Sequence, residues 1–147
     1  AEPPAEPPVR AANWALSEYA LRACADLIAL TGDVVTSRVL VELVLAGTRA
    51  APVDVVPSPD GGLARLGRPV RIAALAAALA LPRETVRRHV AALETLGFCR
   101  REPQGVITAL PAAMATPVVE MARANAGNVQ RLFANLARTG ALADWEG

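Results

Sequence analysis

The stretch that decides the fold runs from Ile72 to Arg101 and reads IAALAAALALPRETVRRHVAALETLGFCRR. Its beginning repeats apolar side chains at positions i, i+3, i+4 and i+7, which predicts a helix with one face on a core; they are Ile72, Leu75, Ala76 and Leu79. Pro82 suits the first turn of a helix rather than its interior, so we expect a second helix to open there. Two short helices joined by a tight turn follow from this spacing.

The second helix is expected over residues 83–96, and Gly97 supplies a left-handed C-cap. One side of this helix is apolar and is assigned to the core; it carries Val86, Val90, Leu93 and Leu96. At about 100° per residue, another set projects away from that side; it comprises Glu84, Arg87, Arg88, Ala91 and Thr95, with Thr85 at the flank. The helix therefore presents a polar, arginine-bearing outer face.

A hairpin is expected directly after this helix, over residues 98–110. Two runs that suit strands, Phe98–Glu102 and Val106–Leu110, flank the turn-forming residues Pro103 and Gly105. Such a hairpin after an exposed helix is a wing, and Arg100 and Arg101 lie at its base. The expected fold is mainly α, with a small β-hairpin wing and flanking N- and C-terminal helices.

This order of elements resembles the winged helix-turn-helix of bacterial transcription regulators, the group that includes the MarR-like and IclR-like families. The resemblance is carried by Leu75-Ala76, Leu79, Leu81, Thr85-Val86, Arg88, Val90, Leu93 and Gly97-Phe98 with Arg100-Arg101. It implies a transcription regulator that reads duplex operator DNA with helix 83–96 in the major groove, assisted by the wing 98–110.

The expected DNA contacts combine base reading with phosphate binding. Arginine can bind guanine O6 and N7 with two hydrogen bonds, arginine and threonine can hold phosphates, and a small residue allows close approach. The residues expected at this interface are Arg83, Glu84, Thr85, Arg87, Arg88, Ala91, Arg100 and Arg101. The resemblance itself carries base-reading and phosphate-binding roles only to Thr85, Arg87 and Arg88.

Composition limits the other functions. A 53% hydrophobic content argues against disorder, and a net charge of +1 means that any DNA-binding surface must come from local clustering of arginine. Aromatic residues are only 3% of the chain, which disfavours stacking platforms for single-stranded nucleic acid. No phosphate-binding loop, metal-ligand cluster or catalytic constellation is found, so we expect neither an enzyme nor a cofactor.

The rest of the chain is expected to divide into a flexible proline-rich tail over residues 1–12, N-terminal helices over 13–47, a loop over 48–69, the winged domain over 70–111 and a C-terminal helix over 112–147. The helices are placed at Asn13–Leu30, with Asn13 as the cap, at Val34–Ala46, ended by Gly47, and at Thr116–Thr139. The sequence does not decide whether the C-terminal helix breaks near Gly127, nor whether short strands form at Val53–Val56 and Val70–Arg71.

Partners are inferred from this organisation. Terminal helices flanking a winged domain either cover its core or pair with a twin subunit, and a homodimer is favoured because two recognition helices about 34 Å apart can read a palindrome. Core packing of Trp14 and Tyr19 is expected, and a site for a small-molecule effector beside these two aromatics is the alternative. The chain lacks an apolar span of about 20 residues, so no membrane association and a cytoplasmic location are expected.

Three alternatives stay open. A winged-helix module that binds a protein and no DNA would also fit the near-neutral charge. Cys99, next to Arg100, is either a redox-sensitive thiolate or a buried, inert thiol. His89, the one histidine, is expected to pack or to contact phosphate rather than to bind metal.

Overall fold

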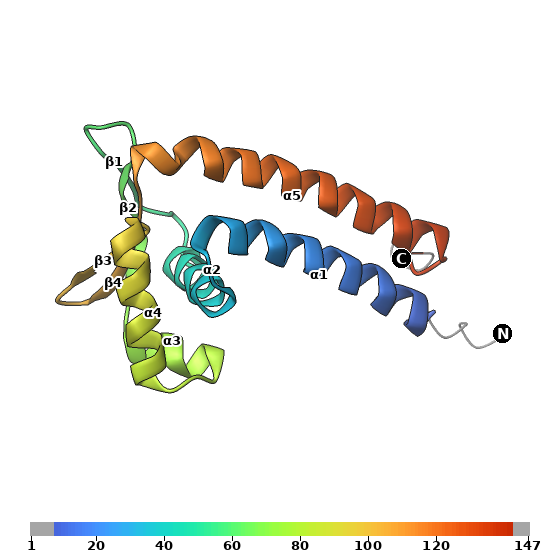
Figure 1. The fold of residues 1–147 in the computed structure, drawn as a ribbon, viewed down its shortest axis with the longest axis horizontal. Helices are drawn as coiled ribbons and strands as arrows, with labels where there is room; N and C mark the ends of the chain where they lie inside the picture. Colours follow the sequence, from blue (N-terminus) through green and yellow to red (C-terminus); the bar gives the residue numbers. More distant parts are fainter. Residues whose placement is uncertain (1–7, 143–147) are drawn as a thin grey trace. The chain divides into compact units, whose positions relative to one another are not determined.

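The structure, a computed structural model, describes residues 8–142. Its elements are α1 (Val9–Thr31), α2 (Val34–Thr48), β1 (Val55–Pro57), β2 (Leu63–Val70), α3 (Ile72–Leu79), α4 (Arg83–Leu96), β3 (Cys99–Glu102), β4 (Gly105–Leu110) and α5 (Ala112–Arg138), as Figure 1 labels them. They form two compact units. Unit 2 comprises Leu27–Val119, whereas unit 1 comprises α1 up to Asp26 and α5 from Glu120.

Unit 2 contains a winged helix-turn-helix, and the predicted fold class is confirmed. A four-stranded antiparallel sheet in the order β1-β2-β4-β3 accompanies α2, α3 and α4. The hairpin β3–β4 pairs Cys99 with Thr108 and Arg101 with Val106, as a wing requires. The predicted turn between α3 and α4 is also present, with Ala80 left-handed at φ 53° and Pro82 as the N-cap of α4.

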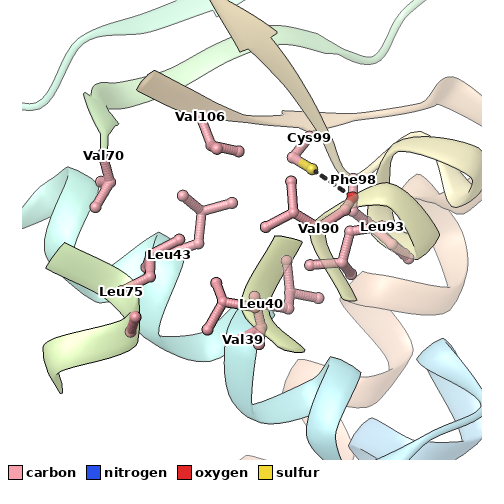
Figure 2. Packing of buried hydrophobic residues seen from close by; sticks show 12 residues of the cluster. Val39, Leu40, Leu43, Val70, Leu75, Val90, Leu93, Phe98, Cys99 and Val106 are labelled. Carbon is pink, nitrogen blue, oxygen red and sulfur yellow. Dashed lines mark hydrogen bonds between the residues drawn. The ribbon is translucent and has the colours of Figure 1, made fainter. Parts of the chain in front are cut away.

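A single apolar cluster holds these elements together (Figure 2). It joins side chains from three helices and three strands, of which the most deeply buried are Val39, Leu43, Leu75, Val86, Val90 and Leu93. Replacing one of these leucines with alanine would lower the free energy of unfolding by about 2–5 kcal/mol, because apolar burial is lost and a cavity is left. The core thus lies directly under α4 and fixes which side of that helix faces outward.

The segment that the sequence predicted as the loop 48–69 contains β1 and the long strand β2. Gly67 and Pro69 interrupt the apolar pattern of β2, and the pairing of β2 with β4 is irregular between Leu63 and Leu66 and again before Val70. Irregular pairing tolerates these two residues, which normally weaken a strand. The expectation of a loop was therefore wrong for residues 55–57 and 63–69, and the strand left open at Val53–Val56 overlaps β1.

Gly47 was expected to end α2, but it lies inside the helix, which continues to Thr48. The backbones of α2 and β2 approach each other closely at this point. A Cβ on Gly67 would lie 2.3 Å from the carbonyl oxygen of Gly47. Gly67 also has φ +74°, which side chains rarely adopt. Both glycines serve the close approach of α2 and β2 rather than a helix end.

Unit 1 is an antiparallel pair of helices made by parts of α1 and α5. Tyr19 donates to Asn125 at 3.2 Å, and Asn128 donates to Asp26 at 3.3 Å. The helix bounds differ from those expected. Helix α1 begins at Val9, so Asn13 is not its cap but donates to the carbonyl of Val9 at 3.0 Å.

Helix α5 begins at Ala112, includes Pro117 in its early part and runs unbroken through Gly127, so the break considered there does not occur. The predicted proline-rich tail lies outside the described residues over 1–7, and residues 9–12 are helical.

Candidate nucleic-acid interface

Helix α4 is formed and oriented by a strongly amphipathic sequence. Val86, Val90 and Leu93 are fully buried, and Gly97 ends the helix in a left-handed conformation at φ 85°. The N–H of Gly97 donates to the carbonyl of Glu94 and the N–H of Phe98 to that of Leu93, each at 3.0 Å. These bonds give hydrogen-bond donors to carbonyls in the last turn of the helix. The predicted bounds and the predicted C-cap are confirmed.

The predicted contact residues lie on the accessible side of the domain. Arg83, Glu84, Arg87, Arg88 and Ala91 are exposed on α4, and Thr85 is half-buried at the edge of this face. Arg100 and Arg101 are exposed on β3. All eight residues are therefore available to a ligand from solvent.

Ion pairs distinguish the arginines of this surface. Arg87 pairs with Glu84 at 2.6 Å, and Arg101 pairs with Glu94 at 2.7 Å. Within residues 8–142, neither Arg83 nor Arg88 makes an ion pair. Exposed pairs are worth only about 0.2–1 kcal/mol, so a phosphate could replace the acidic partner of Arg87 at little cost.

Arg101 connects the wing to α4. Its Nε donates to Glu94, and its terminal nitrogen donates to the carbonyl of Arg87 at 3.3 Å. Arg100 instead lies beside Glu102, at 3.5 Å, within the same strand. Sequence reasoning grouped these two arginines, but only Arg101 holds the recognition helix against the hairpin.

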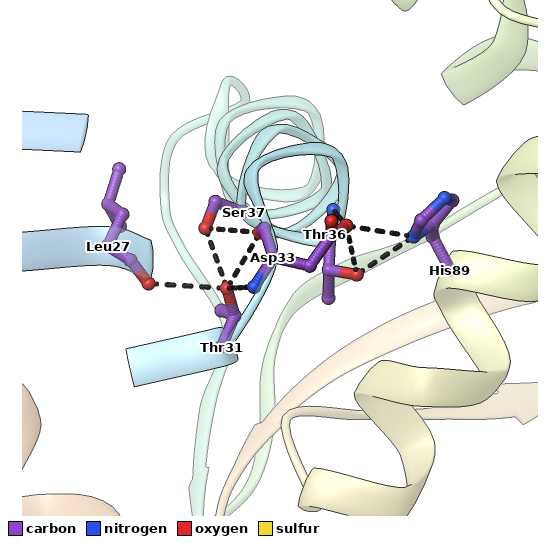
Figure 3. Close-up of polar contacts among 6 residues, drawn as sticks. All are labelled: Leu27, Thr31, Asp33, Thr36, Ser37 and His89. Atoms are coloured by element: carbon purple, nitrogen blue, oxygen red, sulfur yellow. Dashed lines mark hydrogen bonds and ion pairs between the residues drawn. The ribbon is translucent and has the colours of Figure 1, made fainter. Parts of the chain in front are cut away.

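A polar network on α2 supports the middle of α4 (Figure 3). Asp33 caps α2 by accepting hydrogen bonds from the backbone N–H of Thr36 at 2.8 Å and from its hydroxyl at 3.0 Å. Because the one hydroxyl proton of Thr36 goes to Asp33, its oxygen accepts from Nδ1–H of His89 at 2.8 Å. His89 thus ties α4 to the first turn of α2.

The same network has an electrostatic consequence. The hydrogen bonds from Thr36 hold the pKa of the Asp33 carboxyl below its usual value, and the nearby His89, 3.3 Å away, lowers this pKa further. Sequence reasoning missed Asp33 and Thr36. An Asp before Val34 is a recognisable N-cap, but the link from Thr36 to His89 across 53 residues follows only from the fold.

Cys99 is the buried, inert alternative and not a redox-sensitive thiolate. Its side chain lies in the core, with Sγ donating to the carbonyl of Val90 at 3.6 Å (Figure 2). Burial, and to a lesser extent the nearby Glu94, raise the pKa of the Cys99 thiol to about 12 and outweigh the lowering by Arg101. The neighbouring Arg100 that suggested a thiolate does not act on it.

Unit 1 has a hollow of about 670 Å³ where α1 begins and α5 ends. Trp14 is among its lining residues together with Arg10, Asn135 and Arg138. Tyr19 is not, because it contacts Asn125 instead. The two aromatics that the sequence placed at one effector site therefore lie in different surroundings.

Comparison with known protein families decides the class of the winged domain. Residues 62–103 match the IclR helix-turn-helix domain. This segment is similar to the winged helix-turn-helix of IclR regulators. The match includes β2 through β3 and thus contains all eight predicted contact residues. No curated protein and no solved structure matched the chain.

IclR helix-turn-helix domains belong to DNA-binding transcription regulators. Of the two families that the sequence resembled, the IclR-like one is supported. Among the described helices, none is long and apolar enough to span a membrane.

Proposed function

We propose that this chain is a cytoplasmic transcription regulator that reads duplex operator DNA with α4 in the major groove and with the wing against the sugar–phosphate backbone. The observation that carries the proposal is the exposed face of α4 in an IclR-type domain, where Arg83 and Arg88 have no acidic partner among residues 8–142. An arginine free of an ion pair can bind guanine or phosphate without first losing an interaction.

The residues take different roles in this proposal. Arg88 lies opposite the buried stripe of α4 and is placed to read base edges, whereas Arg83 at the helix start contacts phosphate. Arg87 exchanges Glu84 for a phosphate, and Thr85 and Ala91 allow close approach to the groove. Arg100 reaches the backbone from the wing, and Arg101 positions the wing on α4.

The test is binding of fluorescent duplex DNA, both random sequence and the native upstream region, measured by anisotropy over a salt series. The parent should bind more weakly as salt rises, because bound counterions are released from DNA. Arg88→Ala should lose about 1–3 kcal/mol of binding to its preferred sequence, and Arg83→Ala should reduce the salt slope by about 1.

The matched control is Arg49→Ala. Arg49 is exposed like Arg88, although it pairs with Glu42 at 3.2 Å, and it caps the end of α2 opposite to the Thr36 contact with α4. Its replacement should leave DNA affinity unchanged. Equal losses in the Arg49 and Arg88 variants would mean that binding is not localised to α4.

A protein-binding module is the second candidate, and one observation favours it. Glu84 and Glu94 lie close to Arg87 and Arg101 and reduce the positive charge of this face. If the parent binds no duplex DNA even at low salt, this alternative replaces the proposal.

Regulation would act through a homodimer, which presents two copies of α4 to the two halves of a palindrome about one helical turn apart. A small-molecule effector that favours one spacing of the two helices would then change the affinity for DNA. The hollow beside Trp14 is our candidate for its site.

A further inference from the structure

His89 lies on one flank of α4, between the buried stripe of that helix and its exposed face. Thr85 precedes it by one turn and Ala92 follows it by one turn, so the three side chains share one side of the helix. The side chain of His89 is 21% exposed, whereas Val86 and Val90 beside it are fully buried. Part of the imidazole therefore belongs to the protein interior and part to the surface.

The two ring nitrogens of His89 have different surroundings. Nδ1 donates to the hydroxyl of Thr36 and lies 3.3 Å from the carboxylate of Asp33 (Figure 3). Nε2 makes no hydrogen bond within residues 8–142. In that range, the buried side-chain nitrogens and oxygens that lack a partner are on Arg22 and Thr108, so Nε2 is not a buried atom. It is open to solvent on the flank of α4.

The bond to Thr36 determines what Nε2 can do. With Nδ1 as the donor, Nε2 of the neutral ring carries only a lone pair, which cannot bind another acceptor such as a phosphate oxygen. Protonation puts an N–H on Nε2 and a positive charge on the ring, and both favour a phosphate. Imidazoles change their charge between about pH 5 and pH 8. The ability of this ring to bind an anion therefore depends on pH.

The elements around His89 are α2, α3, β3 and α4 itself. Asp33, the cap of α2, is its acidic partner, and Arg88 is its neighbour along α4. Helix α3 carries no charged residue. The other charged side chains of α2 and β3 have partners of their own; Arg38 donates to the carbonyl of Leu79, and the ion pairs are Glu42 with Arg49, Arg100 with Glu102, and Arg101 with Glu94.

Asp33 makes the net charge of this flank depend on the ring. A protonated imidazole offsets the carboxylate, so the pair is neutral and its Nε2–H points to solvent. A neutral imidazole leaves the pair with the negative charge of the carboxylate, which repels a phosphate. Loss of the proton therefore removes a donor and introduces a repulsion at the same place.

We propose that His89 is a proton-dependent contact between α4 and the sugar–phosphate backbone of DNA. A helix with its side chains is about 10–12 Å across and nearly fills a major groove about 12 Å wide, so residues on its flanks lie beside the phosphates that line the groove. When the ring is protonated, Nε2–H donates to a phosphate oxygen, and when the ring is neutral this contact is absent. The inference rests on the proposed function, because its ligand is duplex DNA, and it makes the affinity depend on pH.

The first test is the affinity of the full chain for fluorescent duplex DNA, measured by anisotropy over a salt series at about pH 5.5 and about pH 8. Binding at the lower pH should be about tenfold tighter, as one charge-assisted hydrogen bond would give. The slope of log affinity against log salt should also be steeper there by about 0.9, because one more phosphate is neutralised. A purely structural role of His89 would not make this slope depend on pH.

His89→Gln is the variant that separates this ring from other titrating groups. Its amide can still donate to Thr36, but it cannot become charged. We expect it to bind DNA with the same salt slope at both pH values and with about the affinity of the parent at the higher pH. The amino terminus also titrates in this range, and it is the same in both proteins.

Asp33→Asn tests the acidic partner. Asn keeps a capping side chain for α2 but removes the carboxylate beside Nδ1. The rise in DNA affinity should therefore need a lower pH than in the parent. The matched control is Asp54→Asn, which removes the same charge from an exposed residue before β1 and should leave the pH of this rise unchanged.

A further measurement needs no substitution. His89 is the one histidine of the chain, so isotope-labelled histidine gives imidazole resonances that belong to it alone. When duplex DNA is added, the change of these resonances with pH should move to higher pH, because a ligand that prefers the protonated ring also favours its protonation. A titration that bound DNA leaves unchanged would overturn the inference, whatever the stability of the variants.

The two proposals fail in different ways. A parent that binds duplex DNA with the same affinity and salt slope at both pH values would overturn the His89 contact and leave the proposed function standing. So would a His89→Gln variant that keeps the pH dependence of the parent, because another group would then carry the proton. A parent that binds no duplex DNA at either pH would refute the proposed function and this contact together.

Discussion

The hydroxyl of Thr36 and the imidazole of His89 share a hydrogen bond of 2.8 Å that joins the first turn of α2 to the middle of α4, 53 residues further along the chain. Thr36 is only 3% exposed, so water cannot easily take its place. The bond therefore acts as a fixed support for the helix that is proposed to enter the groove.

Replacing this hydroxyl should measure the strength of that support. Thr36→Val keeps the shape of the side chain and the backbone bond to Asp33, but it removes both the acceptor for His89 and the hydroxyl donor to Asp33. We expect the free energy of unfolding to fall by about 1 kcal/mol, as measured by urea denaturation. Thr95→Val is the control, because Thr95 is exposed and bonds only within α4. A similar loss in both variants would show that the link across α2 and α4 contributes nothing.

The lowered pKa of Asp33 predicts a dependence of stability on pH. A carboxyl whose pKa is lower in the folded state stabilises the fold above its ordinary value of 3.8, and this contribution disappears as pH falls through the folded pKa. Asp33→Asn keeps an N-cap side chain but cannot ionise. Its urea midpoint should therefore fall less steeply than that of the parent below about pH 4. If the urea midpoints of the two proteins fell equally steeply below about pH 4, the stabilising role of the ionised Asp33 would be contradicted.

The two cysteines should differ strongly in reactivity. Cys24 is exposed, whereas Cys99 is buried and its thiol pKa is raised to about 12, so almost none of it is thiolate at neutral pH. With a chromogenic disulfide reagent, we expect one thiol to react quickly and the other only after unfolding in denaturant. In Cys24→Ser the fast phase should vanish. A fast phase that persists in this variant would mean that Cys99 is accessible.

Two glycines should respond to alanine in opposite directions. Gly67→Ala places a methyl group against the backbone of Gly47 at a positive φ, and we expect a loss of more than about 1 kcal/mol in the free energy of unfolding. Gly127 lies inside α5 with nothing within 4 Å of an added Cβ, so Gly127→Ala should stabilise by about 0.5–1 kcal/mol. Thermal unfolding followed by circular dichroism distinguishes the two. A Gly67 variant as stable as the parent would show that the crossing of α2 and β2 can relax.

The winged domain could be predicted because its signals are local. Pro82, Gly97 and the spacing of Val86, Val90 and Leu93 each specify a feature of α4 within a few residues. The IclR match and the observed bounds confirm that part. The candidate interface followed from it, since the buried stripe of one helix determines its exposed side.

The features that escaped prediction depend on distant contacts. The strand β2 was hidden because Gly67 and Pro69 interrupt its pattern, and only the crossing with α2 explains the glycine. The sequence located α1 but did not determine its buried side, on which Trp14 and Leu21 do not lie. Which side of a helix is covered depends on its neighbours, and α1 buries polar groups against α5.

The order β1-β2-β4-β3 leaves the sheet with two outer strands, and neither offers a template for another strand. On one side β1 has three residues and ends in Pro57, which has no N–H to donate. On the other side β3 carries Arg100, Arg101 and Glu102 in succession. Short length, proline and charge all discourage edge-to-edge growth. Copies of this chain are therefore kept from joining their sheets edge to edge at either end.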